Sequence, residues 1–118
     1  IAPSNTYKDF WKYMEMIFSY AGTLSLSKEL ESIDIQKIEI GHVFIQGGSP
    51  GHAIIVVDMA TNSEGKKMFL LAQSYMPAQE IQILKNPSNL HSPWYSISDS
   101  GILSTPEWQF YNTDLKQF

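Results

Sequence analysis

The chain has 118 residues, a net charge of −4 and no cysteine. Its length supports a single domain with a two-layer core. The acidic balance gives no basic surface for nucleic acid or an anionic membrane, and no run of about 18 apolar residues predicts a membrane span. The missing cysteines exclude a disulfide framework, a thiolate metal site and a thiol nucleophile within these residues.

The first predicted element is an amphipathic helix from Thr6 to about Tyr20. Its apolar residues recur every three or four positions, and Gly22 is well placed to end it. Core packing is the simplest role for this aromatic stripe. A short helical turn is predicted through 28–30. The chain begins at Ile1 without an initiator methionine, which is typical of a processed or trimmed product.

After Ile38 the pattern changes to short apolar runs rich in β-branched residues, typical of strands buried on both faces. The predicted strands cover 43–45, 53–57, 68–73, 80–84 and 108–111, with a hairpin turn at 62–65 and a long ordered loop over 85–106. A sheet that is apolar on both faces needs cover on both. One helix covers one face, so the other cover must come from the long loop, a partner or preceding sequence.

The predicted fold class is therefore α+β, with the N-terminal helix packed on a mostly antiparallel sheet in a single domain over 1–118. A polar residue stands out in this sheet because His52 precedes five hydrophobic residues, where burial does not require it. A four-residue loop at 62–65 would place Ile54 opposite Gln73, so that His52 and Gln73 share a sheet face within reach of each other.

An amide oxygen behind an imidazole fixes the tautomer and orientation of the ring, which suits a general base. His52 and Gln73 are therefore the candidate catalytic pair. A register slip of one residue would move Gln73 to the other face. The alternative is a structural histidine bonded to the turn, with Gln73 satisfied by the backbone.

A metal site shared by His42 and His52 is not expected. If the glycine-rich turn 47–51 joins antiparallel strands, Gln46 lies near His52 and His42 lies four residues further along, roughly 13 Å away at about 3.3 Å per residue. We predict no metal and no cofactor. The turn lacks the ending of a phosphate loop and precedes a strand, so it allows close approach of a ligand or backbone, with Gly51 and Gln46 as candidate binding residues.

Aromatic residues of the long loop and the last strand have two possible roles. Trp94, Tyr95 and Trp108 either line a groove for carbohydrate or peptide, or pin the loop to the core. On the first interpretation, Trp94 and Tyr95 are ligand-binding residues.

A family resemblance rests on four segments of the chain: 43–53, 69–79, 92–95 and 105–108. Together they resemble an uncharacterised family of secreted or envelope proteins from Bacteroidetes-type bacteria, over nearly all of 6–118. The string Leu-Ala-Gln-Ser-Tyr-Met-Pro-Ala-Gln at 71–79 is its most specific part. Family members look longer at the N-terminus. The resemblance thus implies a C-terminal portion of a longer domain, whose upstream part completes the core, and a periplasmic, outer-membrane-attached or secreted location.

More distantly, the order of residues is similar to that of papain-like NlpC and CHAP amidases and peptidases. In those proteins a cysteine on a helix precedes a Gly-Asp strand, a strand that opens with histidine, and a strand with a polar residue. The segment 41–44 matches the first strand, with His42 where aspartate is usual. The resemblance makes His52 the general base and Gln73 its orienting residue, and implies a papain-like core that acts on amide bonds of peptide or peptidoglycan.

The cysteine that should precede this segment is absent from the chain. Two interpretations follow. In the first, the nucleophile comes from sequence upstream of Ile1 and the chain is part of a hydrolase. In the second, the chain is a non-catalytic relative of the bacterial envelope that binds peptide or glycan through its Trp–Tyr loop.

Overall fold

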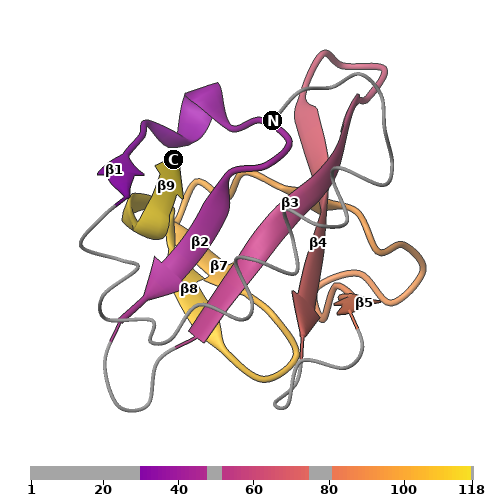
Figure 1. Ribbon diagram of the computed structural model, residues 1–118. Coiled ribbons are helices and arrows are strands. Elements are labelled where there is room, and N and C mark those ends of the chain that lie inside the picture. Colours follow the sequence, from indigo (N-terminus) through magenta and orange to yellow (C-terminus); the bar gives the residue numbers. More distant parts are fainter. Residues whose placement is uncertain (1–29, 48–51, 75–80, 118) are drawn as a thin grey trace, which may run out of the picture.

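The computed structural model describes residues 30–47, 52–74 and 81–117 (Figure 1). These ranges are all-β and contain no α-helix, only the single-turn 3-10 helices η1 (Ile35–Lys37) and η2 (Asn112–Asp114). The prediction of an α+β, papain-like core is therefore wrong for the described part. The helix predicted over 6–20 lies outside the described residues. Within them, no helix is long and apolar enough to cross a membrane.

Seven strands form one antiparallel sheet in the order β1-β9-β2-β3-β4-β5, with β6 also paired to β4. The strands of this sheet are β1 (Glu31–Ser32), β2 (Val43–Gln46), β3 (His52–Thr61), β4 (Lys67–Ser74), β5 (Ile81–Ile83), β6 (Tyr95–Ser96) and β9 (Leu115–Gln117). A separate hairpin consists of β7 (Ile102–Ser104) and β8 (Gln109–Tyr111). The predicted strands are all present. The predicted loop over 85–106 is wrong in part, because β6 and β7 lie within it and pair with β4 and β8.

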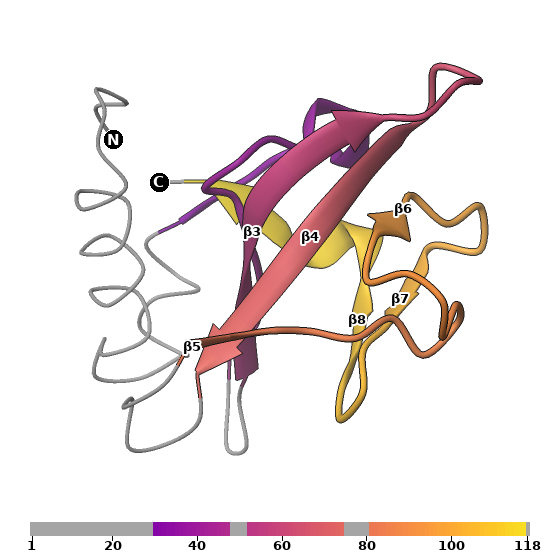
Figure 2. The same cartoon turned by 90° about the vertical axis from the view of Figure 1, so that its right-hand side faces the viewer.

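The central strands are buried on both faces, as their apolar runs predicted. The face that we call the hairpin-side face carries Phe44, Ile54, Val56, Phe69 and Leu71, and it packs against the β7–β8 hairpin and β6. Figure 2 shows β6, β7 and β8 together on one side of β3 and β4. The opposite face carries a smaller cluster, in which Leu30 packs with residues of β2, β3 and β4. The long segment after β5 thus supplies the cover for one face.

The register between β3 and β4 determines which residues share the hairpin-side face. Thr61 pairs with Lys67, so the connecting loop has one residue more than predicted. The register shifts between Val56 and Asp58, where a β-bulge takes up the extra residue, and Ile55 then pairs with Ala72. Beyond the bulge, the ladder therefore places Gln73 on the same face as His52. Without the bulge, Gln73 would point to the opposite face.

Candidate functional site

His52 and Gln73 are joined by a hydrogen bond between their side chains. The distance from His52 Nε2 to Gln73 Oε1 is 2.9 Å. Because an amide oxygen only accepts, this bond requires the ring proton on Nε2 and leaves the lone pair on Nδ1. Gln73 is 2% exposed, which restricts its amide, whereas His52 is half-buried. The predicted proximity of the two side chains is therefore present in the structure.

Two aromatic rings from the C-terminal hairpin lie against the His52 imidazole. The ring centroids of Trp108 and Phe110 are 5.3 Å and 6.0 Å from that of His52. Phe110 is fully buried in β8, and Trp108 is half-buried just before this strand. Because they stand two residues apart on an extended segment, both side chains point back toward the sheet. The imidazole is thus in contact both with Gln73 and with two rings of the β8 segment.

Gln46 pairs with His52 across β2 and β3, as the turn length predicted. Its side-chain amide is fully engaged within the chain. Oε1 accepts from the Trp108 indole Nε1–H at 2.9 Å, and Nε2 donates to Asp114 Oδ2 at 2.8 Å and to the carbonyl oxygen of Gln109 at 3.1 Å. These bonds give Gln46 a scaffolding position beside His52 rather than a free amide for a ligand.

The remaining predicted ligand-binding residues lie apart from this pair. Tyr95 is 2% exposed, its ring stacks on Phe69 at a centroid distance of 6.0 Å, and its hydroxyl donates to the carbonyl oxygen of Lys85. Burial raises the pKa of Tyr95 to about 12. These contacts fit the pinning role and not an open groove. Trp94 is half-buried beside it, and Gly51 lies outside the described residues.

His42 lies at the other end of the β2–β3 pair. Its carbonyl oxygen accepts from the Val56 N–H at 2.9 Å, whereas His52 pairs with Gln46. His42 Nδ1 accepts from the Glu39 N–H at 3.1 Å. Burial lowers the pKa of His42, and the negative charge of Glu39 partly opposes this effect. Within the described ranges, no three or more His, Cys, Asp or Glu side chains form a group that could hold a metal.

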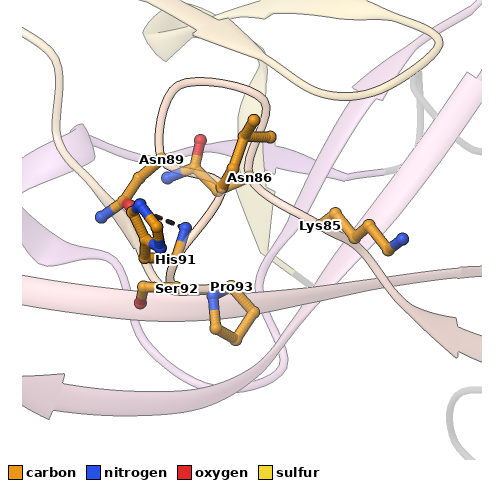
Figure 3. A pocket seen from close by; sticks show the side chains of 7 residues that line it. Lys85, Asn86, Asn89, His91, Ser92 and Pro93 are labelled. Carbon is orange, nitrogen blue, oxygen red and sulfur yellow. Dashed lines mark hydrogen bonds between the residues drawn. The ribbon is translucent and has the colours of Figure 1, made fainter.

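A pocket of about 390 Å³ is formed by the segment after β5 (Figure 3). It is lined by Lys85, Asn86, Asn89, Leu90, His91, Ser92 and Pro93. Figure 3 shows the side chains of Asn89 and His91 close together and that of Lys85 directed away from them. Asn89 Oδ1 accepts from the His91 backbone N–H at 3.1 Å, so part of this polar lining stabilises the loop itself. His52 is not among the lining residues.

Sequence reasoning missed Asp114 and Phe110 as neighbours of the candidate pair and gave Trp108 only a general role. Trp108 and Asp114 lie 62 and 68 positions from Gln46 in the sequence, and both follow the long segment 85–106, whose path the sequence does not indicate. No spacing pattern links them to His52. The one available signal is compositional, because a tryptophan and a phenylalanine two residues apart favour a strand with one buried face.

Comparison with known proteins gives a family but no activity. A family model described as domain of unknown function (4846) matches residues 1–117. No curated protein and no solved structure matches the chain significantly. The resemblance to NlpC and CHAP proteins and the bacterial group therefore receive no support from these comparisons.

Proposed function

Because the chain belongs to the family of domain of unknown function (4846), its chemistry has to be inferred from its site, and we propose that His52 and Gln73 are a general base and its orienting residue in an amide hydrolase. The observation that carries this proposal is the 2.9 Å bond from His52 Nε2 to the buried Gln73 Oε1. In this tautomer the Nδ1 atom keeps its lone pair and can accept a proton from a nucleophile.

The proposed nucleophile is a cysteine thiol supplied from outside these 118 residues, since the chain itself has no cysteine. His52 Nδ1 accepts the thiol proton, the thiolate attacks the amide carbonyl carbon, and the imidazolium returns the proton to the leaving amine. Water then attacks the thioester with His52 again as base, which releases the acid and restores the thiol. Peptide or peptidoglycan is the proposed substrate, and the cell envelope is the proposed location.

A binding module built on Trp94 and Tyr95 is the alternative function. The burial of Tyr95 weakens it, because a residue that is 2% exposed offers almost no surface to a ligand. A structural histidine would also satisfy Gln73. Only a role in activating a nucleophile makes thiol reactivity depend on His52, so that dependence is the decisive measurement.

The test is thiol alkylation by iodoacetamide in the natural protein that contains this chain, compared with its His52→Gln and Gln73→Leu variants. At pH 6 to 7 we expect alkylation to slow by about tenfold or more in the His52 variant, in line with the usual contribution of a general base. The alkylation rate of the Gln73 variant should lie between the rates of the wild type and the His52 variant. His91→Gln is the matched control, since His91 is exposed and lines the pocket after β5, which His52 does not line.

Circular dichroism shows whether each variant is folded, and a second substitution, His52→Asn, takes the place of His52→Gln if that variant does not fold. Equal alkylation rates in the wild type and in the folded His52 variant would remove His52 from the mechanism.

A further inference from the structure

A chain of side-chain hydrogen bonds runs from η2 to the ring that lies against His52. We propose that Gln46 and Asp114 are positioning residues that hold the Trp108 indole against the imidazole. This inference rests on the proposed role of His52 and deepens it, because it names what fixes the indole ring that lies against the imidazole.

The links of this chain are short and continuous. Asp114 Oδ2 accepts from Gln46 Nε2 at 2.8 Å, and Gln46 Oε1 accepts from the Trp108 Nε1–H at 2.9 Å. The Trp108 ring centroid then lies 5.3 Å from that of His52. Gln46 is itself the cross-strand partner of His52, so the chain leaves β2, passes through the C-terminal segment and returns to β3.

Donor and acceptor chemistry fixes the orientation of the Gln46 amide. An indole N–H only donates, and an ionised carboxylate only accepts. Gln46 stands between the two, with its oxygen toward the indole and its nitrogen toward Asp114. The second amide hydrogen goes to the carbonyl oxygen of Gln109. Reversing the amide would turn its nitrogen toward the indole N–H, which is also a donor, and its oxygen toward two acceptors, Asp114 Oδ2 and the Gln109 carbonyl oxygen. A single arrangement of the three side chains is therefore favoured.

Both ends of the chain are held by the backbone. Asp114 Oδ2 also accepts from the Tyr111 N–H at 2.8 Å, which attaches the carboxylate to the end of β8. The carbonyl oxygen of Trp108 accepts from the Thr105 N–H at 2.9 Å and from the Thr105 hydroxyl at 2.6 Å. The indole is therefore fixed through both its main chain and its ring nitrogen. Its place against His52 follows from contacts that do not include His52.

The test uses NMR of the natural protein that contains this chain, with ¹⁵N-labelled histidine and tryptophan. The readouts are the tautomer of His52, the Trp108 indole N–H shift, and the nuclear Overhauser effects between the two rings. In Asp114→Ala and Gln46→Leu we expect a shifted indole signal, weaker ring-to-ring effects and a fall of at least about twofold in the preference for the Nε2–H tautomer.

Asp114→Asn should restore the wild-type signals, because its amide oxygen still accepts a hydrogen bond. The matched control is Asp34→Ala. Asp34 Oδ1 accepts from the Gln36 N–H at 2.9 Å and caps η1, so its loss removes a similar bond at the other 3-10 helix. This control should leave all three readouts unchanged.

An Asp114→Ala protein with the wild-type tautomer ratio and ring-to-ring effects would overturn the inference. Should Gln46→Leu fail to fold, the comparison of Asp114→Ala with Asp114→Asn decides alone. The proposed function is tested separately, and it fails if the alkylation rate is the same in the wild type and in the His52 variant. A positive NMR result combined with such alkylation would keep the positioning contacts and reject the catalytic role.

Discussion

Buried polar side chains in the described part of the chain have partners of complementary hydrogen-bonding type. Within the described ranges, no buried side-chain nitrogen or oxygen lacks a partner, as the cost of burying an unpaired polar group requires. Gln73 pairs with the His52 ring, and the Tyr95 hydroxyl pairs with the carbonyl oxygen of Lys85. The first bond selects one tautomer of the His52 ring. The second only fastens a loop, and its effect should be confined to stability.

Tyr95→Phe should lower the free energy of unfolding by about 1 kcal/mol at pH 7, because the buried hydrogen bond is lost. The substitution should also change how the free energy of unfolding depends on pH above pH 10. The folded-state pKa of Tyr95 is about 12 against an ordinary value of 10, so the folded state keeps its proton between pH 10 and 12 while the unfolded state loses it. Stability therefore falls as the pH rises through this window.

Urea unfolding at pH 8 and pH 11 measures this effect. The Tyr95→Phe protein should lose less stability between the two values than the wild type. Tyr111→Phe, at a position that is 51% exposed, is the control and should behave as wild type. Identical alkaline losses in the Tyr95 variant and the wild type would contradict the prediction.

The β3–β4 hairpin shows how an element can reach a predicted contact by an unpredicted route. The loop between the strands is one residue longer than expected, and the bulge near Val57 compensates for it. The sequence does not reveal this bulge, since Ile54 to Val57 is a continuous apolar run without alternation. The shared face of His52 and Gln73 therefore depends on two departures from a regular hairpin that cancel each other.

Gly65→Ala should destabilise the protein by about 1 kcal/mol through the turn of this hairpin. Gly65 has φ of 80°, which L side chains rarely adopt, and an added Cβ would meet nothing within 4 Å. The cost is therefore conformational rather than steric crowding. Gly65→Asn should cost less, since asparagine tolerates this region.

Chemical denaturation of the wild type and both Gly65 variants gives the comparison. Equal midpoints for all three proteins, or equal losses for alanine and asparagine, would show that backbone conformation does not limit this turn.

At the scale of the whole molecule, the C-terminal third closes one face of a sheet whose central strands β2, β3 and β4 come from the middle third. Phe44 of β2 packs against Phe69 of β4 and Phe110 of β8, with ring centroids 6.1 Å and 6.2 Å away. The β9 strand then returns to pair with β2 and β1. The same hairpin segment that completes this core also places Trp108 and Phe110 against His52, so the core and the candidate site share the Phe110 side chain.

Phe110→Ala should lower the free energy of unfolding by about 3 to 5 kcal/mol, as expected for truncating a fully buried aromatic side chain. Tyr111→Ala is the matched control. It changes the next residue of β8, whose side chain is half exposed, and should cost no more than about 1 kcal/mol. Urea unfolding measures both. Similar losses for the two variants would mean that the hairpin does not close the core through Phe110.

Much of the sheet could be predicted from the sequence. Side chains alternate between the two faces of a strand, and the length of a turn sets which residues of the two strands lie opposite each other. The prediction that Gln46 lies opposite His52 rests on this geometry. The prediction that Gln73 shares the face of His52 assumes a loop one residue too short, and it holds only because the bulge between Val56 and Asp58 compensates. The cover over one face of the sheet could not be predicted in the same way. Strands β6 and β7 have only two and three residues, too few to show alternation, and the composition of the segment that holds them predicts a loop.

The sequence by itself determined where the central strands lie and that a histidine and a glutamine stand among their apolar residues. That the two share a face follows from the bulge between Val56 and Asp58, which only the tertiary structure reveals. Only the tertiary structure decided what surrounds that pair. Trp108 and Asp114 reach Gln46 across 62 and 68 positions, and no local periodicity encodes which distant segment covers a face. An apolar or hydrogen-bonding side chain could pair with many others in the sequence, and only the packing of the folded chain determines which of them it contacts.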